Sequence, residues 1–255
     1  MLNKNIKTLN KGLGKLFDNL KIKKGDNVII HSNSAGLFQF EKNKKKALDS
    51  FYKVLINKIG KKGSICIPAY NYQFTKTKFF SYFNSSSEVG YLSNFFLKKF
   101  PKKRTINPIF SHVLLGKSLA HLINKIDYEI LGNESIFSFF EKKNFKIICF
   151  CCSPSEITYL HYLEKKNNVR YRFDKIFNGK LKYPKNNINI RIKYFVGKKK
   201  IDYSLKNKNL INLVDNKSFI EKTFGRFSCY VVSAKYLKTI LEKKLKKKPY
   251  LLISE

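Results

Sequence analysis

Acidic residues are scarce in this sequence. Its 255 residues include 52 lysines and arginines but only 17 aspartates and glutamates, and the formal net charge is +35. A surface of this charge favours anionic ligands over cationic ones. Tryptophan is absent, and arginine and alanine are rare, whereas lysine, asparagine, isoleucine, phenylalanine and tyrosine, all with A/T-rich codons, are abundant. Codon bias therefore explains much of the charge. Because the lysines are spread along the chain, without a zinc finger, an RNA-binding sheet motif or a basic arm, we expect no specific nucleic-acid partner.

Long apolar runs are also missing. No stretch of about 18 apolar residues exists, so we expect no membrane span. The polar N-terminus, Met1–Lys7, lacks the apolar core of a signal peptide. The five cysteines are odd in number and lie mostly inside apolar runs, which indicates reduced thiols in a cytoplasmic protein. Their spacing fits no metal motif, and we expect no metal.

The periodicity of the apolar residues indicates an α/β protein. Helical spacing predicts helices over residues 6–20, 38–59, 89–100, 118–125, 135–143 and 209–221. Short apolar runs predict strands at 27–31, 63–68, 112–116 and 146–152, with strand-like sequence again at 188–196. Residues 69–87 lack a clear period and are expected to form a long loop. No repeat or linker divides the chain, so we expect a single domain over residues 1–255.

Two segments could carry chemistry. Thr158, His161 and Glu164 are three residues apart, so on a helix they share one face directly after the apolar run 147–152. This arrangement suits a general base and the carboxylate that orients it. The loop Ser32-Asn-Ser-Ala-Gly36 follows a predicted strand and opens a helix, where backbone amides can bind phosphate. Taken alone, the loop favours the plainer interpretation, an ordinary turn of small residues.

Five blocks of this sequence, in order, resemble the aminoglycoside 3-N-acetyltransferase family over roughly residues 10–175. In chain order, the blocks are Lys24-Gly-Asp-Asn-Val-Ile-Ile-His31-Ser32, Gly63-Ser-Ile-Cys-Ile-Pro68, Arg104-Thr-Ile-Asn-Pro108-Ile-Phe-Ser111 with Gly116, Gly132-Asn-Glu-Ser135, and Thr158-x-x-His161-x-x-Glu164 followed by Val169-Arg-Tyr-Arg172. The resemblance implies an α/β sandwich with a central mixed β-sheet flanked by helices. It also implies acetyl-CoA as the donor and an amino sugar as the acceptor. The pattern along the chain itself predicts a less regular C-terminal third.

The resemblance assigns roles to particular residues. His161 is the expected general base, with Glu164 and Thr158 beside it. The expected acetyl-CoA-binding residues are His31, Ser32, Asn33, Ser34, Ala35, Arg104, Thr105, Phe110 and Ser111. Tyr70 and Asn107 are the expected substrate contacts. Asn107 stands where family members often carry histidine, and Phe38-Gln-Phe-Glu41 replaces a glycine pair that is usual after the loop.

Several alternatives stay open at this point. Cys151 or Cys152 as an acyl-carrying nucleophile is the rival mechanism, although an apolar strand disfavours thiolates. Two rival functions also remain. The chain could be an inactive relative that only binds ligands, or it could be a cationic nucleic-acid-binding protein. Because polycationic antibiotics need several carboxylates, the scarcity of acidic residues favours an amino sugar carried on a nucleotide or another anionic group, such as a polysaccharide precursor.

Overall fold

The computed structural model describes residues 2–183, 186–204, 206–215 and 217–253. Its centre is a mixed six-stranded sheet in the order β4-β2-β1-β5-β9-β8. The strands are β1 (Asn27–Ser32), β2 (Ser64–Pro68), β4 (His112–Leu115), β5 (Lys146–Phe150), β8 (Phe219–Phe224) and β9 (Phe227–Ser233). β1 pairs in parallel with β2 and β5, whereas β4, β8 and β9 run antiparallel to their neighbours. The three parallel strands therefore end at the same edge of the sheet.

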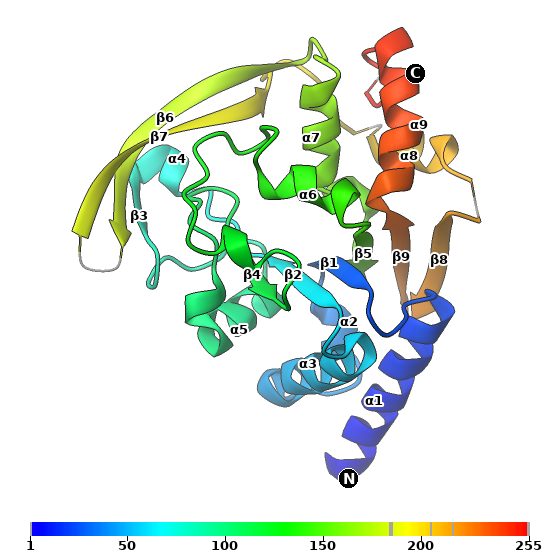
Figure 1. The fold of residues 1–255 in the computed structure, drawn as a ribbon. Coiled ribbons are helices and arrows are strands. Elements are labelled where there is room, and N and C mark those ends of the chain that lie inside the picture. Colours follow the sequence, from blue (N-terminus) through cyan, green and yellow to red (C-terminus); the bar gives the residue numbers. More distant parts are fainter. Residues whose placement is uncertain (1, 184–185, 205, 216, 254–255) are drawn as a thin grey trace.

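Helices cover both faces of this sheet (Figure 1). The helices are α1 (Leu2–Asn19), α2 (Ala35–Phe38), α3 (Lys44–Ile59), α4 (Phe74–Thr77), α5 (Tyr91–Lys99), α6 (Ile136–Lys142), α7 (Tyr159–Lys166), α8 (Lys206–Leu213) and α9 (Ala234–Lys247). Side chains alternate between the two faces along β1, because successive residues of a strand point to opposite sides. Val28 and Ile30 pack with α1, α3 and α5, and Ile29 packs with α6, α7 and α9.

A second, three-stranded sheet lies beside the first. It has the order β3-β6-β7 and comprises β3 (Phe79–Ser81), β6 (Arg172–Tyr183) and β7 (Asn186–Gly197). β6 and β7 form a long antiparallel ribbon, which arches over the upper left of Figure 1. Within the described ranges, every helix is too short or too polar to cross a lipid bilayer.

Most sequence-predicted elements are confirmed, including the first helix, the strands that become β1, β2, β4 and β5, and the helix that carries His161. The helix expected over residues 38–59 is in fact two, α2 and α3. Glu41 accepts a hydrogen bond from the Asn43 amide, and Asn43 in turn caps α3 by accepting from the Lys46 amide. These local bonds compete with a continuous helix.

Four other expectations need correction. Residues 118–125 contain only a short 3-10 turn at Ala120–Leu122, and the expected loop at 69–87 contains α4 and β3. The helix expected over 209–221 ends at Leu213, and β8 follows. The C-terminal third is regular rather than irregular, because β8, β9 and α9 complete the central sheet and cover it.

Candidate active site

A cleft of about 720 Å³ opens at the edge where β1, β2 and β5 end. In sheets with parallel strands, ligands bind outside the carboxyl ends of the strands. The wall of this cleft includes residues at or just after the ends of these three strands: His31, Ser32, Pro68, Tyr70, Cys151, Cys152 and Ser153. Thr158 and Glu156 come from the segment leading into α7, and Glu88, Val89, Gly90 and Tyr91 from the start of α5. The fold therefore places the cleft where an α/β enzyme binds its substrates.

The loop after β1 forms one wall of the cleft. All five of its expected ligand-binding residues line the cleft: His31, Ser32, Asn33, Ser34 and Ala35. The Asn33 amide donates to the Phe150 carbonyl at 2.9 Å, and the Asn33 side chain accepts from the Ala35 amide at 3.0 Å. Gly36 follows in close contact with the next strand end, because an added Cβ would lie 2.2 Å from the Cys151 sulfur. Glycine is therefore required at this position.

His31 is an uncharged member of this wall. Burial lowers its pKa from 6.5 to about 4, since desolvation penalises the charged form. The imidazole is therefore neutral near pH 7. Only 7 % of the residue is exposed, and its Nε2 atom has no hydrogen-bond partner among the residues that the structure describes.

The charge of the cleft is opposite to that of the whole chain. Among the described residues lining it, none is lysine or arginine, and two are glutamates, Glu88 and Glu156. Lys44 stands at the rim, where its ammonium contacts the Tyr91 hydroxyl at 3.1 Å and lies 4.5 Å from the centre of that ring. Among the described residues, the interior of the cleft thus carries no lysine or arginine, and Lys44 lies at its edge.

The candidate base lies on α7, beside the cleft. Thr158 lines the cleft, and His161 follows one helical turn later with 22 % of its side chain exposed. His161 Nδ1 lies 2.9 Å from Glu164 Oε2. A carboxylate can only accept, so Nδ1 carries a proton and donates to Glu164. This is the arrangement of a base with its orienting carboxylate.

Glu164 is fully buried and is held by residues that follow α7. The Tyr171 hydroxyl donates to its Oε1 at 3.1 Å, and Arg172 Nε lies 2.7 Å from its Oε2. Burial, followed by the nearby Glu164 charge, raises the pKa of Tyr171, so this hydroxyl stays protonated and donates. The chain returns to Glu164 because α7 ends in a Schellman motif, in which Asn168 has a φ of 50° and the Val169 amide donates to the Glu164 carbonyl.

The Arg104–Ser111 block does not line the cleft. Arg104 is 1 % exposed, and its guanidinium donates to the Ser111 hydroxyl and to the carbonyls of Ala69, Tyr82 and Ser85. Burial lowers its pKa to about 10. Ser111 is fully buried and Thr105 is 7 % exposed, and the Thr105 hydroxyl accepts from the His112 amide. These side chains hold together the framework behind the cleft.

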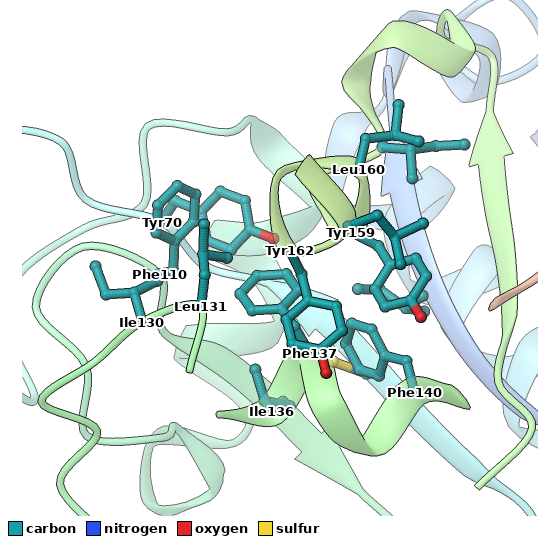
Figure 2. Close-up of a cluster of buried hydrophobic side chains, with 14 of the residues drawn as sticks. Tyr70, Phe110, Ile130, Leu131, Ile136, Phe137, Phe140, Tyr159, Leu160 and Tyr162 are labelled. Carbon is teal, nitrogen blue, oxygen red and sulfur yellow. The ribbon is translucent and has the colours of Figure 1, made fainter. Parts of the chain in front are cut away.

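Phe110 and the two expected substrate contacts belong to the same framework. Phe110 packs edge-on against Tyr70, and both lie in the aromatic cluster shown in Figure 2. Tyr70 also lines the cleft, but its hydroxyl is buried against His112 Nε2 at 3.2 Å. Asn107 is 1 % exposed, and its side-chain oxygen accepts from the amides of Ile109 and Phe110. Asn107 therefore shapes a turn instead of facing the cleft.

Sequence reasoning did not single out five residues that the structure brings to the site: Glu88, Tyr91, Glu156, Tyr171 and Arg172. Glu156 is two residues before Thr158, and an acidic residue so close to the candidate base in a lysine-rich chain was a usable signal. Tyr171 and Arg172 stand in the last resemblance block, which assigned them no role, whereas Glu88 and Tyr91 depend on long-range packing and carry no local pattern.

Cys151, one of the two cysteines at the cleft, is poorly suited to act as a nucleophile. Cys151 contacts Cys229, with 3.6 Å between the two sulfurs. A hydrogen bond with Cys229, together with burial, raises the pKa of the Cys151 thiol. The thiolate is the nucleophilic form, so this environment disfavours attack by Cys151. Within the described ranges, no group of three or more histidine, cysteine and carboxylate side chains could hold a metal ion.

The mixed sheet, the cleft at the carboxyl ends of its parallel strands, and the paired His161 and Glu164 are together typical of an α/β enzyme that binds its ligands at such strand ends. The profile of the aminoglycoside 3-N-acetyltransferase family matches residues 29–246, and this chain belongs to that family. The members of the family are acetyl-CoA-dependent N-acetyltransferases. No curated protein sequence matches the chain.

Solved structures share the fold at low sequence identity. The aminoglycoside acetyltransferase AAC-IIIb in binary complex with CoASH superposes with a TM-score of 0.79 at 15% identity, covering 96% of that chain and 94% of this one. YokD from Bacillus subtilis gives a TM-score of 0.77 at 14% identity, with 94% of each chain covered. AAC-VIa bound to sisomicin gives 0.75 at 14% identity, with 98% of that chain and 94% of this one covered. Each likeness extends over almost the whole of both chains.

Proposed function

We propose that this chain, as a single acyltransferase domain, transfers an acetyl group directly from acetyl-CoA to the amino group of an amino sugar, with His161 as the general base. The observation that carries the proposal is the 2.9 Å contact between His161 Nδ1 and the buried Glu164 carboxylate, one helical turn from a cleft-lining threonine. Membership of the family supplies the donor and the class of acceptor.

The proposed reaction has one transfer step. His161 Nε2 removes a proton as the amine nitrogen attacks the thioester carbonyl, because only a neutral amine is nucleophilic. Glu164 stabilises the resulting imidazolium and fixes the ring. The carbon–sulfur bond then breaks, and the CoA thiolate takes the proton back from His161. The Thr158 hydroxyl and the amides of the loop after β1 are the candidates for steadying the oxyanion.

The cleft suits the pantetheine arm of acetyl-CoA. That arm is uncharged, as is the neutral His31 in the wall formed by the loop after β1. The phosphates of CoA need a cation, and Lys44 supplies one at the rim. The two positions at which the sequence departs from the family pattern, Phe38 and Asn107, leave this wall intact. Phe38 itself lines the cleft, and Asn107 lies in the framework behind it.

The acceptor that we propose is an amino sugar linked to a nucleotide, or another polysaccharide precursor, rather than an antibiotic. Glu88 and Glu156 suit the ammonium end of such a molecule inside the cleft. A polycationic antibiotic would extend its further ammonium groups over a surface that carries a net charge of +35. An anionic carrier group would be attracted to the same surface.

Thiol release measures this function directly. The enzyme should release free CoA thiol from acetyl-CoA when amino-sugar acceptors, including nucleotide-linked ones, are supplied, and acetyl-CoA should raise its melting temperature. His161→Ala should abolish release, while His121→Ala, at an exposed histidine, should leave it unchanged. Binding without turnover for every acceptor would indicate a relative that only binds ligands. Faster turnover of kanamycin-type antibiotics than of nucleotide-linked sugars would overturn the proposed acceptor.

A further inference from the structure

Two partners approach the same oxygen of Glu164 from different elements. On α7, His161 Nδ1 lies 2.9 Å from Glu164 Oε2. Arg172, at the start of β6, has its Nε atom 2.7 Å from the same oxygen. The Arg172 N–H is not aligned as a hydrogen bond, so the contact is an ion pair. Glu164 is fully buried and the Arg172 side chain is 8 % exposed, so water screens this pair little.

The position of Arg172 is fixed by its surroundings. Its Nη1 donates to the Phe195 carbonyl at 3.4 Å, and its guanidinium lies 5.5 Å from the centre of the Tyr203 ring. Arginine is a permanent cation with a planar head that stacks on aromatic rings. The β6–β7 ribbon and the Tyr203 segment therefore hold a positive charge against the carboxylate that orients the base.

This charge opposes the effect of Glu164 on the imidazole. A buried carboxylate favours the charged form of a neighbouring histidine, and a protonated histidine cannot act as a base. A cation on the same carboxylate oxygen compensates its charge and lowers that preference. Glu164 can then keep orienting the ring without holding a proton on Nε2.

Other titratable groups face this cluster. Lys165 on α7 is paired with Glu129 and Asp174, and Lys193 on β7 is paired with the same two carboxylates. Tyr171, Tyr194 and Tyr203 have pKa values raised primarily by burial, so they remain neutral. Tyr250 packs on the Tyr171 ring. The charges of Lys165 and Lys193 are thus balanced locally, whereas Arg172 contacts Glu164 itself.

We propose that Arg172 is a positioning residue that shares the Glu164 carboxylate with His161 and so keeps the imidazole in its neutral, base form near neutral pH. The inference rests on the proposed function, in which His161 is the general base. It adds a role for Arg172, which acts through Glu164 without touching either substrate.

The pH dependence of the reaction tests the proposal. In Arg172→Met, the acidic limb of the kcat/KM profile should move to higher pH by about 1 to 2 units, while the rate at high pH is largely kept. Arg172→Lys retains the charge, so its limb should stay close to that of the wild type. Arg170→Met is the matched control, because Arg170 is exposed two residues earlier and should leave the profile unchanged. An equal loss of rate at every pH, with an unmoved limb, would show that Arg172 is only structural.

A second measurement does not depend on activity. The imidazole of His161 can be titrated by NMR in the wild-type protein and in Arg172→Met, with the signal assigned from His161→Asn among the four histidines. The midpoint should rise in Arg172→Met and stay close to that of the wild type in Arg172→Lys, even if no tested acceptor is turned over. An unchanged midpoint in a folded Arg172→Met protein would overturn the role of Arg172. A raised midpoint in a protein without acetyltransferase activity would overturn the proposed function alone.

Discussion

Replacement of Glu164 by glutamine should affect stability and catalysis together. Glu164→Gln keeps the size of the side chain and one carbonyl oxygen, but removes the negative charge. That charge faces His161, Tyr171 and Arg172 inside the protein, at contacts of 2.7 to 3.1 Å. The substitution therefore leaves the Arg172 cation without its carboxylate.

The size of the effect follows from the burial of this pair. Removing one partner of a buried ion pair costs about 3 to 5 kcal/mol, because the other charge stays buried and uncompensated. Arg172 is 8 % exposed and keeps its contact with the Phe195 carbonyl, so we expect the lower end, about 3 kcal/mol. In a chain of this length, that loss corresponds to a fall of about 6 to 12 °C in Tm.

Catalysis should fall for a different reason. The glutamine amide can donate to His161 Nδ1, which would place the imidazole proton on Nε2, the atom that must accept a proton. Loss of an oriented general base costs about 100-fold or more in kcat. Affinity for acetyl-CoA should change little, because Glu164 lies outside the lining of the cleft.

Urea unfolding and steady-state thiol release near neutral pH measure both effects. Glu134→Gln is the control: Glu134 is also paired with a basic side chain, that of Lys125 at 2.8 Å, but its own side chain is 83% exposed. Exposed ion pairs contribute little, so this variant should match the wild type. If Glu164→Gln had the same urea midpoint as Glu134→Gln, the buried ionic cluster would not stabilise the fold. Unchanged kcat would refute the orienting role of Glu164.

Three further substitutions test other parts of the cleft. As the pH falls from about 6.5 to about 4, the wild type should lose stability relative to His31→Gln by about 1.4 kcal/mol per pH unit. The reason is that the unfolded state binds a proton that buried His31 does not. Urea midpoints of the two proteins that change in parallel across this range would contradict the lowered pKa of His31. Gly36→Ala should raise the KM for acetyl-CoA and cost about 1 to 3 kcal/mol through its clash with the Cys151 sulfur. Cys151→Gly, at a φ of 57°, should relieve the clash in the double variant, and a failure to do so would reject this cause. Glu156→Gln should raise the KM for the amino sugar and not that for acetyl-CoA, and an equal rise in both would count against an ammonium contact.

The parts of the fold that could be predicted are those set by local pattern. β1 and α7 follow from a short apolar run and from helical spacing, and the His161–Glu164 contact follows from residues three apart on one helix. The break between α2 and α3 was not predicted, because it depends on the side-chain bonds of Glu41 and Asn43. The completion of the sheet by β9 was missed for another reason: its pairing with β5 is a contact between distant segments.

Arg104 shows why residue type alone did not locate the site. The family resemblance placed the block that contains Arg104 in the wall of the acetyl-CoA site. The structure instead surrounds the guanidinium with the Ser111 hydroxyl and the carbonyls of Ala69, Tyr82 and Ser85. These partners come from separate segments, so no spacing within the block could reveal them.

The two buried arginines, Arg104 and Arg172, are alike in that each guanidinium contacts several groups of the protein. In a chain whose composition strongly favours lysine, Arg104 and Arg172 occupy positions where a planar head contacts several groups at once. Lysine is a point charge on a flexible stem, so it can supply the charge but not several fixed contacts. Arg104 holds together the framework behind the cleft, and Arg172 holds the carboxylate behind the base. The abundant lysines account for the charge of the surface, whereas these rare arginines determine the geometry on which acetyl transfer would depend.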